Sequence, residues 1–534
     1  MPRISIPQLR LELDEALEAP EALRRRLAAA HGLSAEALAS LRISRRSLDA
    51  RGRGAPRFWV TVELELPEGE ALPDGARLLP AGDRPPARRV TPPPRPPLIV
   101  GSGPAGLFCA LELARHGVAS IVLERGHPVE RRKHEVAALY RRGELDPESN
   151  VCFGEGGAGT FTDGKLSTRV RDPAVREVLE ALVEHGADPE ILVTNKPHLG
   201  SERLPAIVKA IREHLEAQGC ELRFGARVER LLIEDGAAAG VGLAGGEELR
   251  GPHVILAAGG SARELFEHLG ALPGVVEPKA FAVGLRVEHP QELIDAGQYG
   301  RWAGHPALPP ADYKLVTRVG GDRGAYAFCM CPGGVVVPTP TEPGALCVNG
   351  MSASRRSSRW ANSALVAEVS RADLAAWGHG EDALAGLRFQ RVLEQAAFKA
   401  GGEDYAAPSS SVRAFLRGRD ALAPGRSSYP RGLVPADLAA LFPAALGADL
   451  RTAVGAFARK MKDFDAAEAR LIGVEARTSA PISLPRGADT VSTALPGLHP
   501  CGEGCGHAGG IVSAAIDGLR VARSIVSRLA GEPL

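Results

Sequence analysis

The sequence has no net charge and few cysteines. Its 64 lysines and arginines balance 64 aspartates and glutamates, so no overall charge draws the protein toward nucleic acid or an anionic membrane. Eight cysteines in 534 residues are too sparse for a disulfide scaffold, and we expect most of them to be reduced and buried. No Cys-x-x-Cys pair and no histidine cluster accompanies them, so we expect no metal site.

Long apolar runs are absent as well. No window approaches eighteen uninterrupted apolar residues, and the first residues, MPRISIPQLRLELDEALE, carry charges where a signal peptide needs an apolar core. We therefore expect a cytoplasmic protein with no transmembrane segment. With 44% hydrophobic and 24% charged residues, the composition is that of an ordinary globular chain, and its length predicts roughly three domains.

The most informative stretch is LIVGSGPAGLFCALELARHGVASIVLERG, residues 98–126. A short apolar run at 98–100, typical of a buried parallel strand, is followed by helical periodicity over 105–115 and by a second apolar run that ends in Glu124. Between the first run and the helix, three glycines have the spacing Gly-x-Gly-x-x-Gly: Gly101, Gly103 and Gly106. Strand, glycine turn, helix and a carboxylate about twenty residues later predict a dinucleotide site.

Each residue type in this unit has a physical reason. Gly101 permits the sharp turn, Gly103 lets the backbone approach a pyrophosphate, and Gly106 lets helix and strand pack closely. The helix start offers unpaired N–H groups and a partial positive charge to phosphate. Glu124 can accept both hydroxyls of an adenosine ribose and would repel a 2′-phosphate, so the pattern disfavours NADP and leaves FAD or NAD.

Composition divides the rest of the chain into parts. Residues 1–92 predict a small α+β module, which ends near a proline-rich linker, RPPARRVTPPPRPP, at 84–97. We assign 97–278 to the first part of the nucleotide-binding domain and 279–454 to an inserted domain that bears a sheet and builds a lid or substrate pocket. Residues 455–534 are expected to return the chain to the first domain.

The N-terminal module contains a basic segment. Residues 42–57, RISRRSLDARGRGAPR, carry six arginines and one aspartate. Such a run can bind phosphates or RNA, but a solvated basic loop is the commoner explanation.

Two glycine-rich segments lie farther along the chain. Residues 149–169 contain five glycines between Gly154 and Gly164, which disfavours helix and strand and predicts a loop whose backbone closely follows a bound group. Near the C-terminus, Gly502, Glu503 and Gly504 precede an apolar helical face that begins at Ile511. The N-terminus of that helix is expected to point toward the same bound group.

Several stretches together resemble a known family: GSGPAGL at 101–107, FGEGGAGTFTDGKL at 153–166, CMCPGG at 329–334, NGMS at 349–352, NSA at 362–364 and PCGEGCGHAGGIVSAAIDG at 500–518. With RRSLDAR in the basic segment, they resemble the bacterial family of uncharacterised FAD-dependent dehydrogenases over nearly the whole chain. LERG at 123–126 is similar to the end of the second strand in the glutathione-reductase-like FAD superfamily. The resemblance implies bound FAD. It also implies an α/β fold: a Rossmann-like FAD-binding domain, an inserted mixed-sheet substrate or cap domain, and a small N-terminal α+β domain.

The resemblance also implies which residues contact the cofactor. They come from the glycine turn, the end of the second strand, the glycine-rich loop, two sheet edges and the C-terminal helix start: Gly101, Gly103, Pro104, Ala105, Gly106, Glu124, Arg125, Gly156, Gly157, Gly159, Thr160, Val228, Gly259, Gly502, Glu503, Gly510 and Ile511. Glu503 would bind a ribityl hydroxyl, and the helix start would face the flavin N1–C2 carbonyl, where negative charge gathers on reduction.

Two residues are candidates for catalysis. Lys165 could place a cation beside the flavin N1–C2 carbonyl or a substrate anion, or it could be an ordinary lysine on a loop surface. Where the family tends to show Ala and Tyr after Gly-Glu-Gly, this chain has Cys505 and His507. His507 could act as a general acid because its ordinary pKa is near neutrality, but a histidine that packs beside the glycine turn is the favoured alternative.

Cys329 and Cys331 are two thiols one residue apart. In an extended segment they would point to the same side, so both could face one pocket and relay electrons to the flavin. A disulfide between residues i and i+2 is strained, however, and free cysteine usually behaves as a small buried hydrophobe. The sequence alone therefore favours a structural role.

The leading functional hypothesis is an FAD-dependent oxidoreductase that transfers a hydride between flavin N5 and a small-molecule substrate. NAD(P)H would bind only transiently, because the repeats of the glycine spacing at 154–159 and 504–509 lack the rest of a second nucleotide unit. One alternative is an RNA-modifying flavoprotein anchored by residues 42–57, which the zero net charge disfavours. The other is a non-enzymatic FAD sensor or scaffold.

Overall fold

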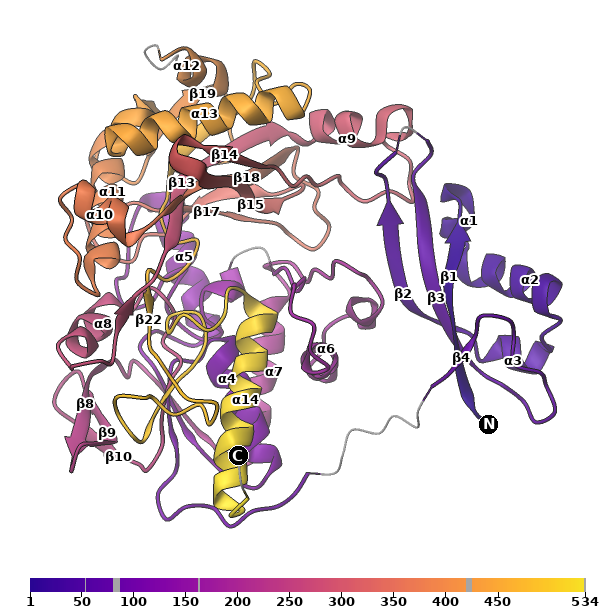
Figure 1. Ribbon diagram of the computed structural model, residues 1–534, viewed down its shortest axis with the longest axis horizontal. Coiled ribbons are helices and arrows are strands. Elements are labelled where there is room, and N and C mark those ends of the chain that lie inside the picture. Colours follow the sequence, from indigo (N-terminus) through magenta and orange to yellow (C-terminus); the bar gives the residue numbers. More distant parts are fainter. Residues whose placement is uncertain (53, 80–86, 162–163, 419–424, 533–534) are drawn as a thin grey trace.

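Three parts make up the fold: a small N-terminal module, a parallel-sheet domain, and a mixed-sheet domain inserted into it (Figure 1). The computed structural model describes residues 1–52, 54–79, 87–161, 164–418 and 425–532. Of the predicted linker at 84–97, residues 84–86 lie outside these ranges, and 87–97 contains no helix or strand. None of the described helices is long and apolar enough to cross a membrane.

The N-terminal module is an antiparallel sheet packed against short helices. Its strands have the order β2-β3-β1-β4. Alternate residues of β3, from Phe58 to Leu64, are buried in a core shared with the helices, which is the period-two pattern of a half-buried strand. The elements are β1 Arg3–Leu11, α1 Leu13–Leu17, α2 Ala19–His31, α3 Ala35–Ala39, β2 Arg42–Asp49, β3 Arg57–Glu65 and β4 Arg77–Leu78.

The interpretation of residues 42–57 as a loop is wrong for their first half. Arg42–Asp49 forms β2, which pairs with β3 from Arg42 opposite Glu63 to Asp49 opposite Arg57. The backbone hydrogen bonds of that ladder outweigh the solvation of the arginines, whose side chains still reach polar partners from the strand. The module also contacts both other parts of the molecule, through hydrogen bonds from Asn195 N to Arg46 O and from Gln298 Nε2 to Ala50 O.

The parallel-sheet domain has the predicted Rossmann-like core. Its strand order is β23-β11-β5-β6-β7, and every neighbouring pair is parallel. Ile99, Val122 and Ile255 point to one face, where helices cover them, whereas Leu98 and Val100 point to the other. The strands are β5 Leu98–Val100, β6 Ile121–Glu124, β7 Glu221–Phe224, β11 Val254–Leu256 and β23 Leu498–Pro500; the helices are α4 Pro104–Arg115, α5 Val129–Arg142, α6 Ala174–Glu184, α7 Leu204–Ala217, α8 Arg263–Gly270 and α14 Ile511–Leu529.

A small antiparallel sheet completes this domain. It has the order β10-β9-β8 and packs on the face of the parallel sheet that carries Leu98 and Val100. Its strands are β8 Val228–Glu234, β9 Ala237–Leu243 and β10 Glu248–Arg250. The chain then leaves the domain through β12 (Glu277–Pro278) and later returns through β22 (Ile482–Ser483), and these two crossings pair with each other.

The inserted domain is built on a seven-stranded sheet of order β14-β15-β18-β13-β21-β19-β20, in which only β19 and β20 are parallel neighbours. Helices α11 and α13 cover one face of it, and Figure 1 shows α13 on the side away from the parallel sheet. A hairpin, β16 with β17, lies beside it. The elements are β13 Phe281–Pro290, α9 Gln291–Tyr299, β14 Val316–Val319, β15 Arg323–Cys331, β16 Val335–Pro338, β17 Val348–Met351, β18 Trp360–Val369, α10 Arg371–Ala376, α11 Ala385–Ala400, β19 Ala407–Ser411, α12 Val412–Arg417, β20 Leu433–Pro435, α13 Ala444–Lys460 and β21 Arg470–Glu475.

The predicted end of the inserted domain at residue 454 is wrong. That residue lies inside α13, and the following strand, β21, pairs with β13 and β19 in the inserted sheet. The partners of β21 lie far away in the sequence, so no local pattern marks this strand as part of the insertion. The chain returns to the parallel-sheet domain only at β22.

Candidate functional site

A large cavity lies between the parallel-sheet domain and the inserted domain. Its volume is about 1610 Å³, and both domains line it. A site for one drug-sized ligand usually measures ~300–1,000 Å³, so the cavity has room for a dinucleotide and a second molecule. Residues at the carboxyl ends of β5, β6, β11 and β23 form its floor, which is where ligands of open α/β sheets bind.

Two helices begin at this cavity without a side-chain cap. Helix α4 begins after Gly103 and α14 after Gly510, and among the described residues neither cap position supplies a side-chain acceptor. The two helices pack closely: a Cβ atom at Gly518 of α14 would lie only 2.1 Å from the carbonyl oxygen of Ala105 in α4. Unpaired N–H groups and the partial positive charge of both helix starts therefore face one cavity, an arrangement that suits phosphate.

The glycine turn has the geometry that the sequence predicts. Gly101 has a φ of +104°, and a Cβ atom there would lie 2.5 Å from the carbonyl oxygen of Ala257. At Gly106 a Cβ atom would lie 2.0 Å from the carbonyl oxygen of Gly101, so this glycine permits close contact of helix and strand. Gly103 is different, because its Cβ atom would meet nothing closer than 3.8 Å. The space over Gly103 belongs to the cavity.

Glu124 lines the cavity but already has protein partners. Its Oε2 accepts hydrogen bonds from Ser102 N at 3.0 Å and Ser102 Oγ at 2.7 Å. Its Oε1 accepts from Gly126 N at 2.9 Å and Gly154 N at 3.0 Å. These hydrogen bonds join three loops to Glu124. A carboxylate has about four acceptor sites, so a ribose hydroxyl would share the two oxygens of Glu124 with these donors.

Most of the residues expected at the cofactor line this cavity: Gly101, Gly103, Pro104, Ala105, Glu124, Arg125, Gly157, Gly159, Val228, Gly259, Gly502, Glu503, Gly510 and Ile511, together with Lys165 and His507. Gly106, Gly156 and Thr160 lie behind its wall. A Cβ atom at Gly156 would lie 2.0 Å from Thr160 Oγ1, and that hydroxyl donates to Glu155 O at 3.4 Å. Gly156 and Thr160 therefore shape the loop rather than line the space it encloses.

Glu503 is a half-buried carboxyl in the cavity wall to which the described residues donate no hydrogen bond. Burial raises its pKa to about 7; the charge of Lys279 lowers it and the thiol of Cys329 raises it further. A carboxyl with a pKa near neutrality and no partner is suited to a ligand that brings its own hydroxyl donors.

His507 is bound to the backbone. Its Nε2 lies 2.9 Å from Leu484 O, and since a carbonyl only accepts, Nε2 carries the hydrogen. Burial, helped by Arg486, lowers the pKa of His507 below its ordinary value. A neutral imidazole whose N–H is engaged is a poor general acid, so the structure favours the packing interpretation.

Lys165 faces the two thiols of β15. Its Nζ donates to Met330 O and lies 3.7 Å from Cys329 Sγ and 3.7 Å from Cys331 Sγ. The sequence left open whether Lys165 lies beside a cofactor or substrate or on a loop surface; the structure places it at the cavity wall, in contact with the inserted domain. This contact joins residues more than 160 positions apart and had no signal in the sequence.

Three family models match the chain. Residues 280–478 match the C-terminal domain-like region of FAD-dependent proteins, residues 96–135 match an FAD-binding domain, and residues 1–65 match a domain of unknown function. An uncharacterized protein of Clostridium beijerinckii is 38% identical over 548 residues, which cover 98% of this chain and 99% of the relative. The chain belongs to this family of FAD-dependent proteins. FAD is the family's cofactor, and the two domains around the cavity are those that the FAD-related models match.

Other similar proteins cover less of the chain or are more distant. Protein FixC of Escherichia coli is 30% identical over 205 residues, which are 37% of this chain and 44% of FixC. A geranylgeranyl bacteriochlorophyll reductase-like structure from Thermoplasma acidophilum is 14% identical, covers 84% of this chain and 80% of its own, and has a TM-score of 0.37.

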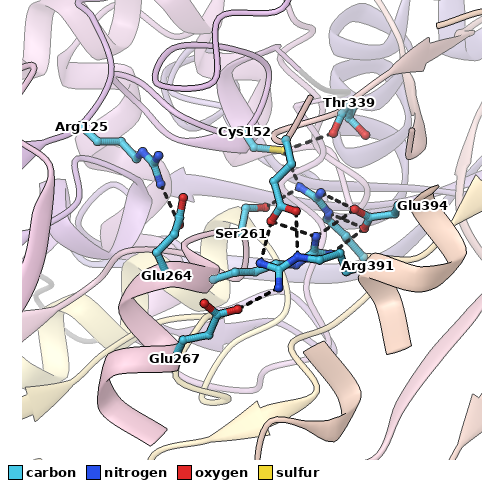
Figure 2. Close-up of polar contacts among 11 residues, drawn as sticks. Arg125, Cys152, Ser261, Glu264, Glu267, Thr339, Arg391 and Glu394 are labelled. Atoms are coloured by element: carbon cyan, nitrogen blue, oxygen red, sulfur yellow. Dashed lines mark hydrogen bonds and ion pairs between the residues drawn. The ribbon is translucent and has the colours of Figure 1, made fainter. Parts of the chain in front are cut away.

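A cluster of ion pairs joins the two domains of this FAD-dependent protein at one edge of the cavity. Glu394 of α11 accepts bidentate hydrogen bonds from Arg263 of α8, at 2.8 and 3.0 Å, and from Arg477, at 2.7 and 2.8 Å. Figure 2 shows Glu394 and Arg391 on α11 with Glu267 opposite, and Arg391 Nη1 donates to Glu267 at 2.9 Å. Arg477 also lines the cavity and donates to Ser261 Oγ at 3.2 Å. Sequence reasoning missed this cluster because its members share no motif.

Four of the six arginines of the basic segment have side-chain partners within the described part of the chain. Arg42 pairs with Glu63, Arg46 with Glu190 and Arg51 with Asp49. Arg45 Nη2 donates to Asn195 Oδ1 at 3.1 Å, and Asn195 lines the cavity. Arg53 lies outside the described residues. The contacts of Arg45 and Arg46 hold the N-terminal module beside the cofactor cavity, whereas those of Arg42 and Arg51 stay within the module.

A possible cation-binding group lies away from the cavity lining. His127, Glu135 and Asp146 offer ligand atoms within 4.8 Å of one another. His127 Nδ1 lies 2.8 Å from Glu135 Oε1, a contact that is an ion pair only when the histidine is protonated. The expectation of no metal site stays a prediction.

Proposed function

We propose that the protein is an FAD-dependent oxidoreductase that transfers a hydride between flavin N5 and an organic small molecule held under the inserted domain. The observation that carries the proposal is that one cavity joins two uncapped helix starts and an open glycine turn to a wall supplied by the inserted domain. Its volume leaves space beside a dinucleotide.

The residues at the cavity floor fit FAD. The pyrophosphate would lie over Gly103 at the start of α4, the adenosine end near Glu124 and Val228, and the ribityl chain near Glu503. The start of α14 would face the flavin, where its partial positive charge stabilises the negative charge of the reduced ring. When bound, FAD supplies the acceptor and donor chemistry of hydride transfer.

The opposite wall supports an organic substrate. Tyr326 and Phe328 of β15 line the cavity together with Tyr313, and Lys165 and Lys314 add amino groups. Aromatic faces contact a planar or apolar body, and ammonium groups bind an acidic group. A substrate that combines these two features is the chemistry we propose for this wall.

The test is anaerobic reduction of the bound flavin. The holoprotein is mixed with organic candidate donors, and with NADH and NADPH, while flavin absorbance is followed. We expect an organic substrate with an acidic group to bleach the flavin. The described residues contain a single parallel sheet, so we expect any nicotinamide to react without a tight complex, as calorimetry would show. A flavin that dithionite reduces but no donor or acceptor turns over would contradict catalysis and favour the sensor or scaffold alternative.

FAD affinity is expected to rise with pH between 6 and 8. Burial raises the pKa of Glu503 to about 7 in the empty cavity, so at pH 6 most of this carboxyl is neutral. Ribityl hydroxyls donate to the charged form, so binding releases a proton, and affinity increases until the carboxyl is ionised. We expect about tenfold tighter binding at pH 8 than at pH 6.

Fluorescence titration of apoprotein at both pH values measures this change. In Glu503→Gln the side chain keeps its shape but cannot ionise. The FAD affinity of this variant should therefore be the same at both pH values, apart from pH effects that the variant and the wild type share. An equal pH dependence in the variant and the wild type would place the titrating group elsewhere.

A further inference from the structure

Cys329 and Cys331 share one cation at the cavity wall. Each sulfur lies 3.7 Å from Lys165 Nζ, so the two sulfur atoms are no more than twice that distance apart. The strand is irregular there: the register of β15 against β18 shifts between Phe328 and Cys331, and Cys329 has a φ of +48°. The Cys331 thiol reaches back toward Cys329 O at 3.4 Å. Both thiols thus contact the same ammonium group, on a stretch of strand that departs from regular geometry.

A second cation holds Cys331. Arg286 Nη2 donates to Cys331 Sγ at 3.3 Å and to Cys329 O at 2.9 Å. The guanidinium is itself fixed, because it is fully buried and bonds Glu475 at 2.8 Å and Asn362 at 2.7 Å. Cations beside a thiol favour its thiolate form, which is the nucleophile in thiol–disulfide chemistry.

The two thiols differ in access. Cys329 is half-buried and lines the cavity, whereas Cys331 is fully buried behind it. Cys329 also lies close enough to Glu503 to affect the ionisation of that carboxyl across the cavity. An accessible thiol beside a buried partner, with cations at both, is the arrangement of reversible redox cysteines. A merely structural pair needs neither the cations nor the access.

We propose that Cys329 and Cys331 form a dithiol–disulfide couple that exchanges an electron pair with FAD in the same cavity. On oxidation two S–H bonds break and one S–S bond forms; the electron pair and one proton pass to FAD, and the second proton leaves to solvent. Reduction of the disulfide reverses each transfer. The couple depends on the FAD site and not on the organic substrate, so it can be tested when that substrate is unknown.

The number of electrons that the protein takes up tests the couple. Holoprotein is oxidised with diamide, freed of reagent and titrated anaerobically with dithionite. We expect the wild type to take up two electrons per chain beyond those of its flavin, and Cys329→Ser and Cys331→Ser to lose this excess. Intact mass should show the loss of two hydrogens after oxidation in the wild type and in neither of these two serine variants. Cys152→Ser removes another thiol of the cavity lining and should behave as the wild type.

Apoprotein tests whether electrons reach the disulfide through FAD or directly from the reductant. Apoprotein that carries the disulfide should keep it under the same titration, because the electrons reach it through the flavin. Lys165→Met should slow alkylation of Cys329 at pH 7 about tenfold in apoprotein and holoprotein alike. Equal electron uptake by the wild type and both serine variants, or a disulfide reduced as fast without FAD, would overturn the proposal.

Discussion

Replacing Gly103 by leucine is expected to weaken FAD binding at least a hundredfold and to leave the fold intact. The backbone at Gly103 has a φ of −72°, which any residue adopts, and its Cβ atom would meet nothing closer than 3.8 Å. The side chain would instead occupy the space at the start of α4 where a pyrophosphate would lie. Loss of two charge-assisted hydrogen bonds, at about 1.5–3 kcal/mol each, corresponds to roughly a hundredfold or more.

Flavin fluorescence during titration of the apoprotein measures this loss, and circular dichroism checks the fold. Gly297→Leu is the matched control, because Gly297 is exposed on α9 and its Cβ atom would meet nothing within 4 Å. Gly106→Ala should fail in another way, since its Cβ atom would lie 2.0 Å from a backbone oxygen and should destabilise the domain. Unchanged FAD affinity in Gly103→Leu would show that the pyrophosphate does not bind at the glycine turn.

Replacing Glu394 by alanine is expected to lower the free energy of unfolding by about 3–5 kcal/mol. Burial raises the pKa of Glu394, but Arg477 and Arg263 outweigh it and lower that pKa to about 2. Removing the carboxylate leaves Arg477, 13% exposed, without its carboxylate partner between the domains, and leaves Arg263, 1% exposed, with only its 3.2 Å contact to Glu342. Urea unfolding of the holoprotein at pH 7 measures the change.

The matched control for Glu394 lies at the start of the same helix. Asp382 pairs with Arg388 in solvent, both side chains being about half exposed, so Asp382→Ala should cost at most about 1 kcal/mol. The folded pKa of Glu394 lies below its ordinary value of 4.5. Its contribution is therefore present above pH 4.5 and is lost as the pH falls toward 2. Equal destabilisation by Glu394→Ala and Asp382→Ala would show that the buried cluster does not hold the domains together.

The residues expected to bind FAD could be predicted because the sequence pattern that marks them is local. Gly101, Gly103 and Glu124 lie within a single strand–helix–strand unit, and backbone geometry dictates those residue types at that spacing. The same local reasoning predicted the irregular glycine-rich loop that begins near residue 149. It failed for Gly156 and Thr160, since which side of a loop faces a ligand depends on what packs behind it.

The part of the site that the inserted domain supplies could not be predicted, because it depends on contacts between residues far apart in the sequence. Strand β21 joins the inserted sheet through partners about sixty or more residues away, and the Lys165 contact with the thiols crosses from one domain to the other. The cluster around Glu394 likewise gathers residues from α8, α11 and the segment after β21. Periodicity and motifs report neighbours along the chain, whereas these groups meet only when the two domains close around the cavity.

The FAD content of the purified protein shows whether this cavity binds the cofactor. We expect a yellow protein that releases one FAD per chain on heating, since the cavity would hold the cofactor without a covalent bond, and an apoprotein that takes up one FAD again. A colourless protein whose supernatant contains no FAD, and which takes up none on reconstitution, would contradict the assignment of this cavity.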